Sequence, residues 1–373
     1  MKVISISKSV NPSSMHWNDL YSTLRVKYPG RSFPTLAIRL GWGRVKFRSE
    51  DCAGRRRLYL QAGFPQAVFF LRQLSRRYKA PLVIHVHTPV LAFAVLSARL
   101  LGGRFHVVTT QHNTWSGFRP HQKFCLWIAS LLSDAYVGCG RQATETIPVG
   151  MKTRLRRRLR LFSIPNGIPS DILGKIAERR HVKMTGRDDG SDTKTLIVAK
   201  MAPQKNCMHL LELIAEIPEL GKVTWYGAGK MHSRLLAERK RLGLEARVEF
   251  AGIVSRDRIY EALTEHDFYL TASLWEGLSV ADLEAVAIGC LPLMSDIPER
   301  REIAAETGID LLPQGGVEVW RAEVQRFAAM PFAERAAYGL ALSERACRAF
   351  SLERMTESYM KTYERAALAA SAE

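Results

Sequence analysis

The chain has 373 residues, of which 47% are hydrophobic and 24% charged. This length is sufficient for two domains, and the composition excludes a mainly disordered protein. The formal net charge of +18 is unevenly placed: residues 1–165 hold 27 Lys and Arg against 5 Asp and Glu, whereas residues 166–373 hold 27 against 31. Such a basic half favours a polyanionic partner, although a role in solubility alone is the alternative.

Neither a secretory signal nor a membrane span is recognisable. The longest apolar runs, residues 90–98 and 124–132, have about half the length of a transmembrane helix. The 6 cysteines are scattered, without CxxC pairs or histidines at zinc spacing. We therefore expect reduced thiols, a cytoplasmic location and no bound metal.

Short β-type runs alternate with amphipathic helix-length segments such as 90–102 and 207–220. The expected strands lie at residues 2–7, 81–87, 105–110, 135–140, 195–200, 222–227, 247–252, 267–273 and 290–295. This alternation predicts parallel sheets built from βαβ units. The polar stretch 176–194 shows no periodic apolar face, and we interpret it as a hinge between two α/β halves. The predicted parts are residues 1–168, residues 169–349 and a C-terminal helix in 350–373 that is expected to cross back to the first domain.

Residues 151–162 carry the pattern of a helix lying in a membrane interface. The face expected to enter the lipid holds Met151, Leu155, Leu159 and Phe162, with most of six basic residues opposite. We predict salt-sensitive binding of this segment to anionic membranes. The binding should weaken when four arginines are changed to glutamine, namely Arg154, Arg156, Arg157 and Arg158. The alternative is a helix packed on its own domain with a solvated basic face.

Two further patterns stand at the carboxyl ends of strands in the first half. One strand pattern ends at His87, and the next is followed by His112 and Asn113. A histidine at such a position can polarise a hydroxyl or a sugar oxygen. For His87 we favour a structural role, with its ring bonded to backbone.

In the second half, the strand 195–200 ends at Lys200 and its exit loop brings Lys205. Two lysines leaving one strand end could neutralise a diphosphate leaving group, although solvated loop lysines are equally compatible. The YGAG turn after the next strand contains Gly227, which would let backbone approach a ligand closely. The turn could also be a tight connection without a ligand.

The segment LWEGLSVADLEAVAIG, residues 274–289, places Glu276 before a predicted helix and Glu284 within it. Ser279 with Asp282 resembles a capping box, and Gly289 stops the helix. Free N–H groups at such a helix start can bind phosphate; here they belong to residues around Gly277, Leu278 and Ser279. Carboxylates beside an anion site suit a nucleotide sugar. The alternative is that Glu276 is a surface charge and Glu284 a buried helix acid.

Together these segments resemble glycosyltransferase family 4, whose members are retaining nucleotide-sugar transferases. The resemblance rests on the E-x7-E spacing of residues 276–284, the loop IVAKMAPQKN at 197–206 and the turn SIPNGI at 163–168. It implies the GT-B fold, an α/β arrangement of two Rossmann-like parallel-sheet domains that face each other across a cleft. The first domain would bind the acceptor and the second the nucleotide sugar.

The resemblance also implies roles for individual residues. Glu276 would contact the donor sugar and Glu284 the ribose. The diphosphate would bind to Lys200 and Lys205, and the nucleobase would lie against residues 250–254, including Val254. His112 would be the functional histidine, and no cofactor or obligatory metal is expected. The chain departs from the family in the loop with Ser13 and Ser14, where a glycine pair is common, in Lys200, where arginine is commoner, and in Pro169, where an acid is common.

The expected activity is retaining hexosyl transfer to a glycan or lipid-linked acceptor, in bacterial-type polysaccharide, lipopolysaccharide or glycolipid assembly. Peripheral attachment to the inner face of the cell membrane would accompany it. A basic nucleic-acid-binding protein is an alternative, but no RNP-type strand or recognition helix is recognisable, so no nucleic-acid partner is expected. A GT-B nucleotide-sugar epimerase is a second alternative, which would need no separate acceptor.

Overall fold

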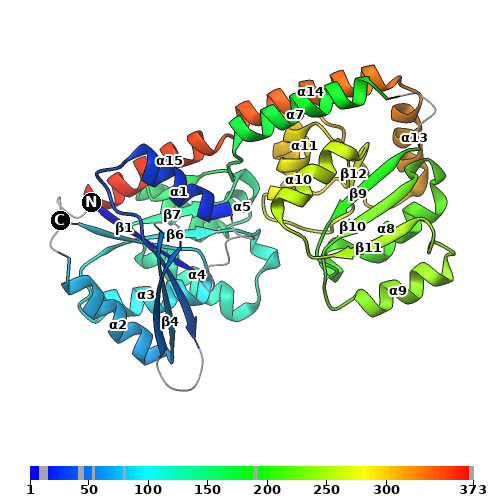
Figure 1. Ribbon diagram of the computed structural model, residues 1–373. Helices are drawn as coiled ribbons and strands as arrows, with labels where there is room; N and C mark the ends of the chain where they lie inside the picture. Colours follow the sequence, from blue (N-terminus) through cyan, green and yellow to red (C-terminus); the bar gives the residue numbers. More distant parts are fainter. Residues whose placement is uncertain (8–15, 41–45, 53–54, 79–80, 188–191, 369–373) are drawn as a thin grey trace. The chain divides into compact units, whose positions relative to one another are not determined.

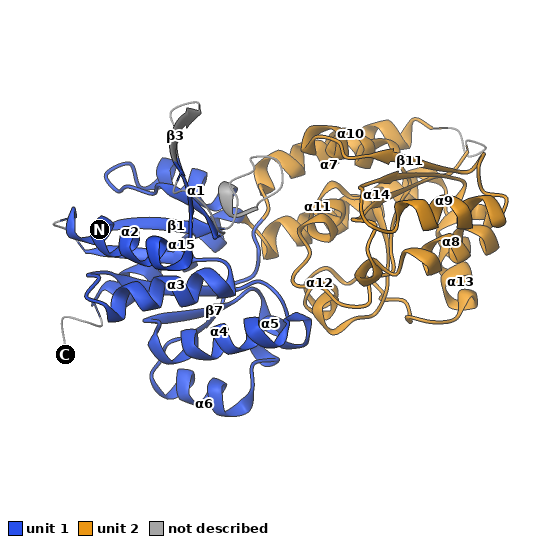
Figure 2. Ribbon diagram, turned by 90° about the horizontal axis from the view of Figure 1, so that it is seen from below, with its two compact units in different colours: residues 1–167, 352–373 blue, residues 168–351 orange. Residues whose placement is uncertain are grey.

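The computed structural model of the chain describes residues 1–7, 16–40, 46–52, 55–78, 81–187 and 192–368 (Figure 1). The loop with Ser13 and Ser14 lies outside these residues. The chain divides into two compact units, one made of Met1–Gly167 with Leu352–Glu373 and the other of Ile168–Ser351 (Figure 2). No helix in the described ranges is long and apolar enough to cross a membrane.

The first unit is built on a sheet whose eight described strands have the order β3-β4-β2-β1-β5-β6-β7-β8. Neighbours pair in parallel except β3 and β4, which are antiparallel. The strands are β1 (Lys2–Ser7), β2 (Thr35–Leu40), β3 (Lys46–Cys52), β4 (Arg55–Ala62), β5 (Leu82–Val86), β6 (His106–Gln111), β7 (Ala135–Gly138) and β8 (Leu161–Ser163). The parallel strands place the carboxyl ends of β5 and β6 at one sheet edge.

Helices cover both faces of this sheet (Figure 1). α2 (Phe64–Arg76), α3 (Pro89–Leu100) and α4 (Pro120–Leu132) bury one apolar core against it. α1 (His16–Lys27) and the C-terminal α15 (Leu352–Leu368) bury a second core on the other face. The remaining helical pieces are η1 (Trp115–Gly117), α5 (Arg141–Glu145) and α6 (Val149–Arg157).

The second unit has a five-stranded parallel sheet in the order β11-β10-β9-β12-β13. Its strands are β9 (Lys194–Val198), β10 (Lys222–Tyr226), β11 (Val248–Gly252), β12 (Phe268–Thr271) and β13 (Leu291–Met294). One face packs on α8 (Cys207–Glu216), α9 (His232–Arg241) and α13 (Val317–Ala328). The further helices are α7 (Ser170–Thr185), α10 (Arg256–Glu265), α11 (Val280–Ile288), α12 (Arg301–Thr307), α14 (Phe332–Ala349) and the 3-10 turns η2 (Pro203–Lys205), η3 (Pro218–Leu220) and η4 (Pro298–Arg300).

Two parallel α/β sheets confirm the predicted fold class, and each of the nine predicted strands is present. Four further strands were not predicted, namely β2, β3, β4 and β8. β3 and β4 read KFRSEDC and RRRLYLQA, so charged residues fill much of both. A search for continuous apolar runs therefore misses both strands.

The predicted hinge at 176–194 is wrong, because the chain passes from the first unit to the second at Gly167–Ile168 and this stretch belongs to the second unit. Its first ten residues are helical. They continue α7, a 16-residue helix of the second unit. Its buried face holds Leu173, Ala177, Arg180 and Met184, which are spaced as on one side of a helix. Arg180 is only 2% exposed and donates hydrogen bonds to the carbonyl oxygens of Leu263 and His266. A buried arginine therefore interrupted the apolar period in the sequence.

The predicted interfacial helix at 151–162 is also wrong. α6 ends at Arg157, and Leu159 has a left-handed backbone with φ of 52°. Met151 and Leu155 are buried in the core of the first unit, so they are not available to enter a lipid interface. Lys152 and Arg156 form ion pairs with Glu145. This segment is therefore a core-packed helix with a solvated basic face.

Candidate functional site

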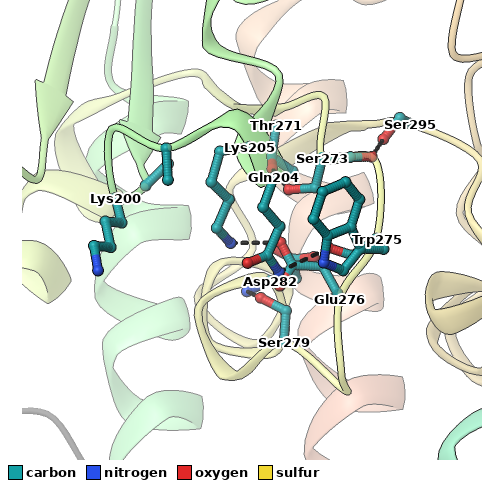
Figure 3. A network of polar contacts seen from close by, with 12 residues as sticks. Lys200, Gln204, Lys205, Thr271, Ser273, Trp275, Glu276, Ser279, Asp282 and Ser295 are labelled. Atoms are coloured by element: carbon teal, nitrogen blue, oxygen red, sulfur yellow. Dashed lines mark hydrogen bonds and ion pairs between the residues drawn. The ribbon is translucent and has the colours of Figure 1, made fainter. Parts of the chain in front are cut away.

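In the second unit, the loops after β9 and β12 meet through Lys205 and Glu276 (Figure 3). The ammonium of Lys205 lies 2.5 Å from Oε1 of Glu276, and Gln204 donates to Oε2 at 3.3 Å. Gln204 also donates to the carbonyl oxygen of Trp275, which fixes the two loops to each other. Glu276 is 7% exposed, and these hydrogen bonds satisfy its buried oxygens. It is therefore a paired, buried acid and not a loop surface charge.

α11 begins beside this pair, as the sequence predicts. Ser279 is its N-cap and accepts a hydrogen bond from the backbone N–H of Asp282, while Gly289 ends it with φ of 81°. The Asp282 carboxylate, which a capping box would turn back toward the backbone of Ser279, instead binds Arg300 at 2.8 Å and Tyr269 at 2.9 Å. The Arg300 charge lowers the pKa of Asp282 against the effect of burial, and the pair anchors α11 in the core.

Glu284 belongs to a separate cluster on the same helix. Its Oε1 accepts hydrogen bonds from Arg256 at 2.8 Å and from the hydroxyl of Tyr260 at 2.7 Å. Arg256 also lies over the ring of Tyr260. Glu284 is 7% exposed, so this residue is a buried, hydrogen-bonded helix acid. A ligand hydroxyl reaching Glu284 would meet a carboxylate that α10 already orients.

The structure does not bring Lys200 and Lys205 together. Lys200 is exposed, and its side chain points away from the Lys205–Glu276 pair in Figure 3. Gly227 follows β10 with φ of 141°, and a Cβ there would lie 2.0 Å from the carbonyl oxygen of Ala199. The glycine is thus required by the close approach of two backbone segments. Val254 is half-buried in the loop after β11.

In the first unit, the histidines predicted at two strand ends are in contact. Nδ1 of His87 lies 3.0 Å from Nε2 of His112. On the other side, Nε2 of His87 lies 3.2 Å from the Tyr21 hydroxyl, which is 2.5 Å from Nδ1 of His85. The backbone carbonyl of Asn113 accepts a hydrogen bond from Gln111, which orients the loop after His112. Both ring nitrogens of His87 therefore lie next to other side chains.

This chain of side chains reaches the C-terminal helix. Tyr363 of α15 places its hydroxyl 2.8 Å from Nδ1 of His85, and Thr110 lies 2.7 Å from Nε2. Burial holds the pKa of His85 well below its usual value, and the neighbouring His112 lowers it further. His85 is therefore neutral at pH 7, and only one of its two nitrogens carries a proton. The Tyr21 hydroxyl is fully buried, which raises its pKa.

The Lys205–Glu276 pair and the Glu284 cluster of the second unit lie in a region that matches a known family. Residues 183–335, which include Lys200, Lys205, Glu276 and Glu284, match the glycosyl transferases group 1 family. The sequence is 26% identical to the protein named glycosyltransferase EpsF of Bacillus subtilis, over 76% of this chain and 79% of that one. The chain is a glycosyltransferase with a group 1 domain.

Two more comparisons concern a relative and a solved structure. A phosphatidylinositol N-acetylglucosaminyltransferase subunit of Arabidopsis thaliana is 25% identical over 73% of this chain, which spans 60% of that protein. The solved structure of Anabaena HepE in complex with UDP and glucose has a TM-score of 0.74 at 14% identity, covering 97% of this chain and 99% of the other. The glycosyltransferase therefore has the GT-B fold.

Sequence reasoning missed the residues that hold the predicted site residues in place. These are Gln204 for Glu276, Arg256 and Tyr260 for Glu284, and Tyr21 and His85 for His87. Two of these residues could have been recognised from their spacing in the sequence. Arg256 and Tyr260 are four residues apart, which is the spacing of neighbours on one helix face. The link between Tyr21 and His85 spans 64 positions and has no local signal.

Proposed function

We propose that the chain transfers a hexose, with retention of anomeric configuration, from a nucleotide-diphosphate sugar to a glycan or lipid-linked acceptor. The observation that carries the proposal is the part-buried Lys205–Glu276 pair at the capped N-terminus of α11. A cation and the N–H groups at a helix start suit a diphosphate, while a fixed carboxylate suits sugar hydroxyls. HepE, which has the same fold, was solved as a complex with UDP and glucose.

Each proposed residue has a role in this reaction. Lys205 stabilises the diphosphate that leaves, and the N–H groups around Gly277, Leu278 and Ser279 bind its oxygens. Glu276 holds the sugar and Glu284 the ribose, with Gly227 and Val254 near the nucleotide. His112 with Asn113 would contact the transferring sugar. We propose that no cofactor or metal is required, because cations of the chain neutralise the leaving group.

A lipid-linked acceptor is supported by a cavity of about 430 Å³ in the first unit. It lies where β2 ends and where α3 and α4 begin, and Thr88 in its wall directly follows His87. Ile38, Leu40 and Leu91 provide apolar walls, and Arg119 stands at its polar side. The named activity of one relative acts on phosphatidylinositol, which is also an anionic lipid. An amphipathic acceptor with a phosphate group fits these walls.

Peripheral attachment to the inner face of the cell membrane is part of the same proposal. A row of rings runs from Phe64 through Phe93 to Phe124 and Trp127, with successive centroids 5.6, 6.4 and 6.3 Å apart. Phe124 is 56% exposed and Trp127 45% exposed. Aromatic side chains are favoured at the level of lipid headgroups, and this unit is strongly basic. The row is therefore a better membrane contact than α6.

The donor is tested first by thermal unfolding with UDP-, GDP- and ADP-sugars, because a ligand that binds only the folded state raises the midpoint. The proposal requires that one of these sugars stabilises the protein and that this effect decreases in Lys205→Ala. Product analysis by NMR with the stabilising donor then determines the anomeric configuration. Conversion of the donor sugar without any second substrate would favour the epimerase alternative and contradict transfer.

A further inference from the structure

A second cavity lies in the first unit, at the edge where the parallel strands begin. Its volume is about 730 Å³. Four cationic side chains line it, namely Lys2, Arg25, Arg31 and Arg77. Lys2 starts β1, Arg25 lies in the last turn of α1, and Arg77 is the C-cap of α2. The histidines after β5 and β6 lie at the carboxyl ends of their strands, so this cavity is distinct from the site proposed for transfer.

The cations have fixed positions around the cavity. Arg25 donates to the carbonyl oxygen of Phe33 from Nε at 3.0 Å and from Nη2 at 2.5 Å. Arg31 donates to Glu364 of α15 at 2.9 Å. The ammonium of Lys2 lies 4.1 Å from the centre of the Tyr78 ring. These contacts hold three of the charges without filling the cavity.

No acidic residue is among the described residues that line this cavity. Positions at helix carboxyl ends favour Arg25 and Arg77 individually, because the helix dipole stabilises a cation there. Glu364 compensates the charge of Arg31, and the dipole effect does not explain why Lys2, Arg25 and Arg77 line the same cavity. Like charges at close range repel each other, and an anion in the cavity would relieve this repulsion. The convergence therefore indicates an anionic ligand.

The remaining walls restrict the kind of anion. Phe70, Leu74 and Leu58 are among the lining residues, so the cavity has an apolar side as well as a cationic one. Guanidinium groups bind phosphate oxygens in pairs, and a lysine adds a point charge. We propose that this cavity binds the phosphate group of a phosphate ester, with the organic part of the ester against Phe70 and Leu74. The proposal is independent of the proposed glycosyl transfer.

A phosphate ester could come from a lipid headgroup or from a soluble metabolite. Three probes distinguish these sources: inorganic phosphate, glycerol 3-phosphate, and dihexanoyl phosphatidic acid below its critical micelle concentration. Binding of each to the full chain is measured by calorimetry at constant ionic strength, because added salt screens exposed charges. Tighter binding of the phosphatidic acid would assign a lipid headgroup, whereas equal binding of the two esters would assign a soluble one.

The location of the ester site is tested with two double variants, each of which removes two positive charges. Lys2→Gln with Arg77→Gln removes two cations from the cavity, and Arg154→Gln with Arg158→Gln removes two exposed arginines of the α6 segment. We expect at least about tenfold weaker ester binding in the first pair only, because a hydrogen bond to a charged group is one of the stronger polar contacts. The midpoint shift caused by the stabilising nucleotide sugar should stay unchanged in both.

The proposal is wrong if neither ester binds the wild-type chain, or if both pairs weaken binding equally, which would indicate net charge alone. Arg77→Gln alone provides a milder variant, because Arg77 is exposed and its replacement leaves the contact of Lys2 with Tyr78 in place. An unchanged affinity in this variant and in the double variant would also overturn the assignment. If no nucleotide sugar binds the wild type or any variant, the proposed function is contradicted, but the result for binding of the phosphate esters still stands.

Discussion

The ammonium of Lys205 contacts the carboxylate of Glu276 across two loops of the group 1 domain, at 2.5 Å. Both side chains are largely shielded from water, with 18% and 9% exposure. A diphosphate that binds Lys205 therefore competes with or joins an ion pair that already exists. This relationship makes the two residues one unit, in which changing either alters the other.

The first prediction concerns this pair. Lys205→Ala should weaken nucleotide-sugar binding by roughly tenfold or more, because it removes a charged hydrogen-bond donor. It should also lower the free energy of unfolding by about 1–3 kcal/mol, because the Glu276 charge loses its cation. Calorimetry with the stabilising sugar and urea unfolding measure the two effects. The matched control is Lys200→Ala, an exposed lysine of the same strand exit, which should leave stability unchanged.

Glu284 requires a gentler substitution than alanine. Glu284→Ala removes the acceptor of Arg256 and Tyr260 together, so we expect a loss of stability as well as of ligand binding. Glu284→Gln keeps an oxygen for Tyr260 and removes only the charge. It should reduce the affinity for UDP- or other nucleotide sugars about tenfold while the thermal midpoint without ligand changes little. Wild-type affinity in Glu284→Gln would remove this residue from the donor site.

These two sites show what local sequence could predict. The start and end of α11 follow from Ser279 and Gly289, because capping depends on neighbours within a few positions. The partner of Asp282 did not follow, since Arg300 comes from a turn after the next strand. The same limit applies to Gly227. A glycine is required there because the carbonyl group of Ala199, 28 positions earlier in the chain, leaves no room for a Cβ.

Tertiary packing also explains why α7 and α6 were predicted wrongly. The hydrophobic period of α7 was hidden by Arg180, whose burial is stabilised by hydrogen bonds to carbonyl groups at the C-terminal end of α10. For α6 the sequence predicted Met151 and Leu155 correctly as one apolar face, but Leu159 and Phe162 lie beyond the end of the helix, and the partner of the face could not be specified. Met151 and Leu155 pack on the sheet of their own unit. Amphipathicity predicts that a face is covered, and only the tertiary structure shows by what.

The contact between His87 and His112 leads to a kinetic prediction. If His112 acts on the transferring sugar, we expect His87→Ala to lower kcat by roughly tenfold or more. This loss is part of the rate enhancement that a positioned acid–base group provides, because His87 would orient His112. The KM for the donor should change little, because the donor residues belong to the other unit. His87→Asn can still offer a polar atom near the position of Nδ1 and should recover part of kcat. Equal kcat in His87→Ala and wild type would assign His87 a packing role only.

Turnover should persist in excess EDTA. Lys205 and the N–H groups at the start of α11 would carry the charge compensation that a divalent ion provides in other phosphoryl sites. Within the described ranges, no three His, Cys, Asp or Glu side chains form a metal-type group. The assay compares initial rates with the stabilising donor, with EDTA alone and after addition of Mg²⁺ or Mn²⁺. An absolute requirement for either ion would show that the lysine is not the main neutralising charge.

The last prediction follows from His85. Its pKa in the folded protein lies well below the usual 6.5, because burial disfavours the charged ring. Below pH 6.5 the unfolded chain therefore binds a proton that the folded chain does not, and stability must fall as the pH decreases. For one proton the slope reaches about 1.4 kcal/mol per pH unit. Above pH 6.5 both states hold a neutral ring, and this contribution to the pH dependence vanishes.

Hydrogen exchange of the β5 segment reports this slope, because β5 lies in the core of the first unit. Wild type should lose protection between pH 7 and pH 5.5, after correction for intrinsic exchange rates. His85→Gln keeps polar atoms for Tyr21 and Thr110 but cannot bind the proton, so its slope should be shallower. Burial also lowers the pKa of His106, and this contribution is common to both proteins. Identical slopes would mean that His85 does not resist protonation in the folded unit.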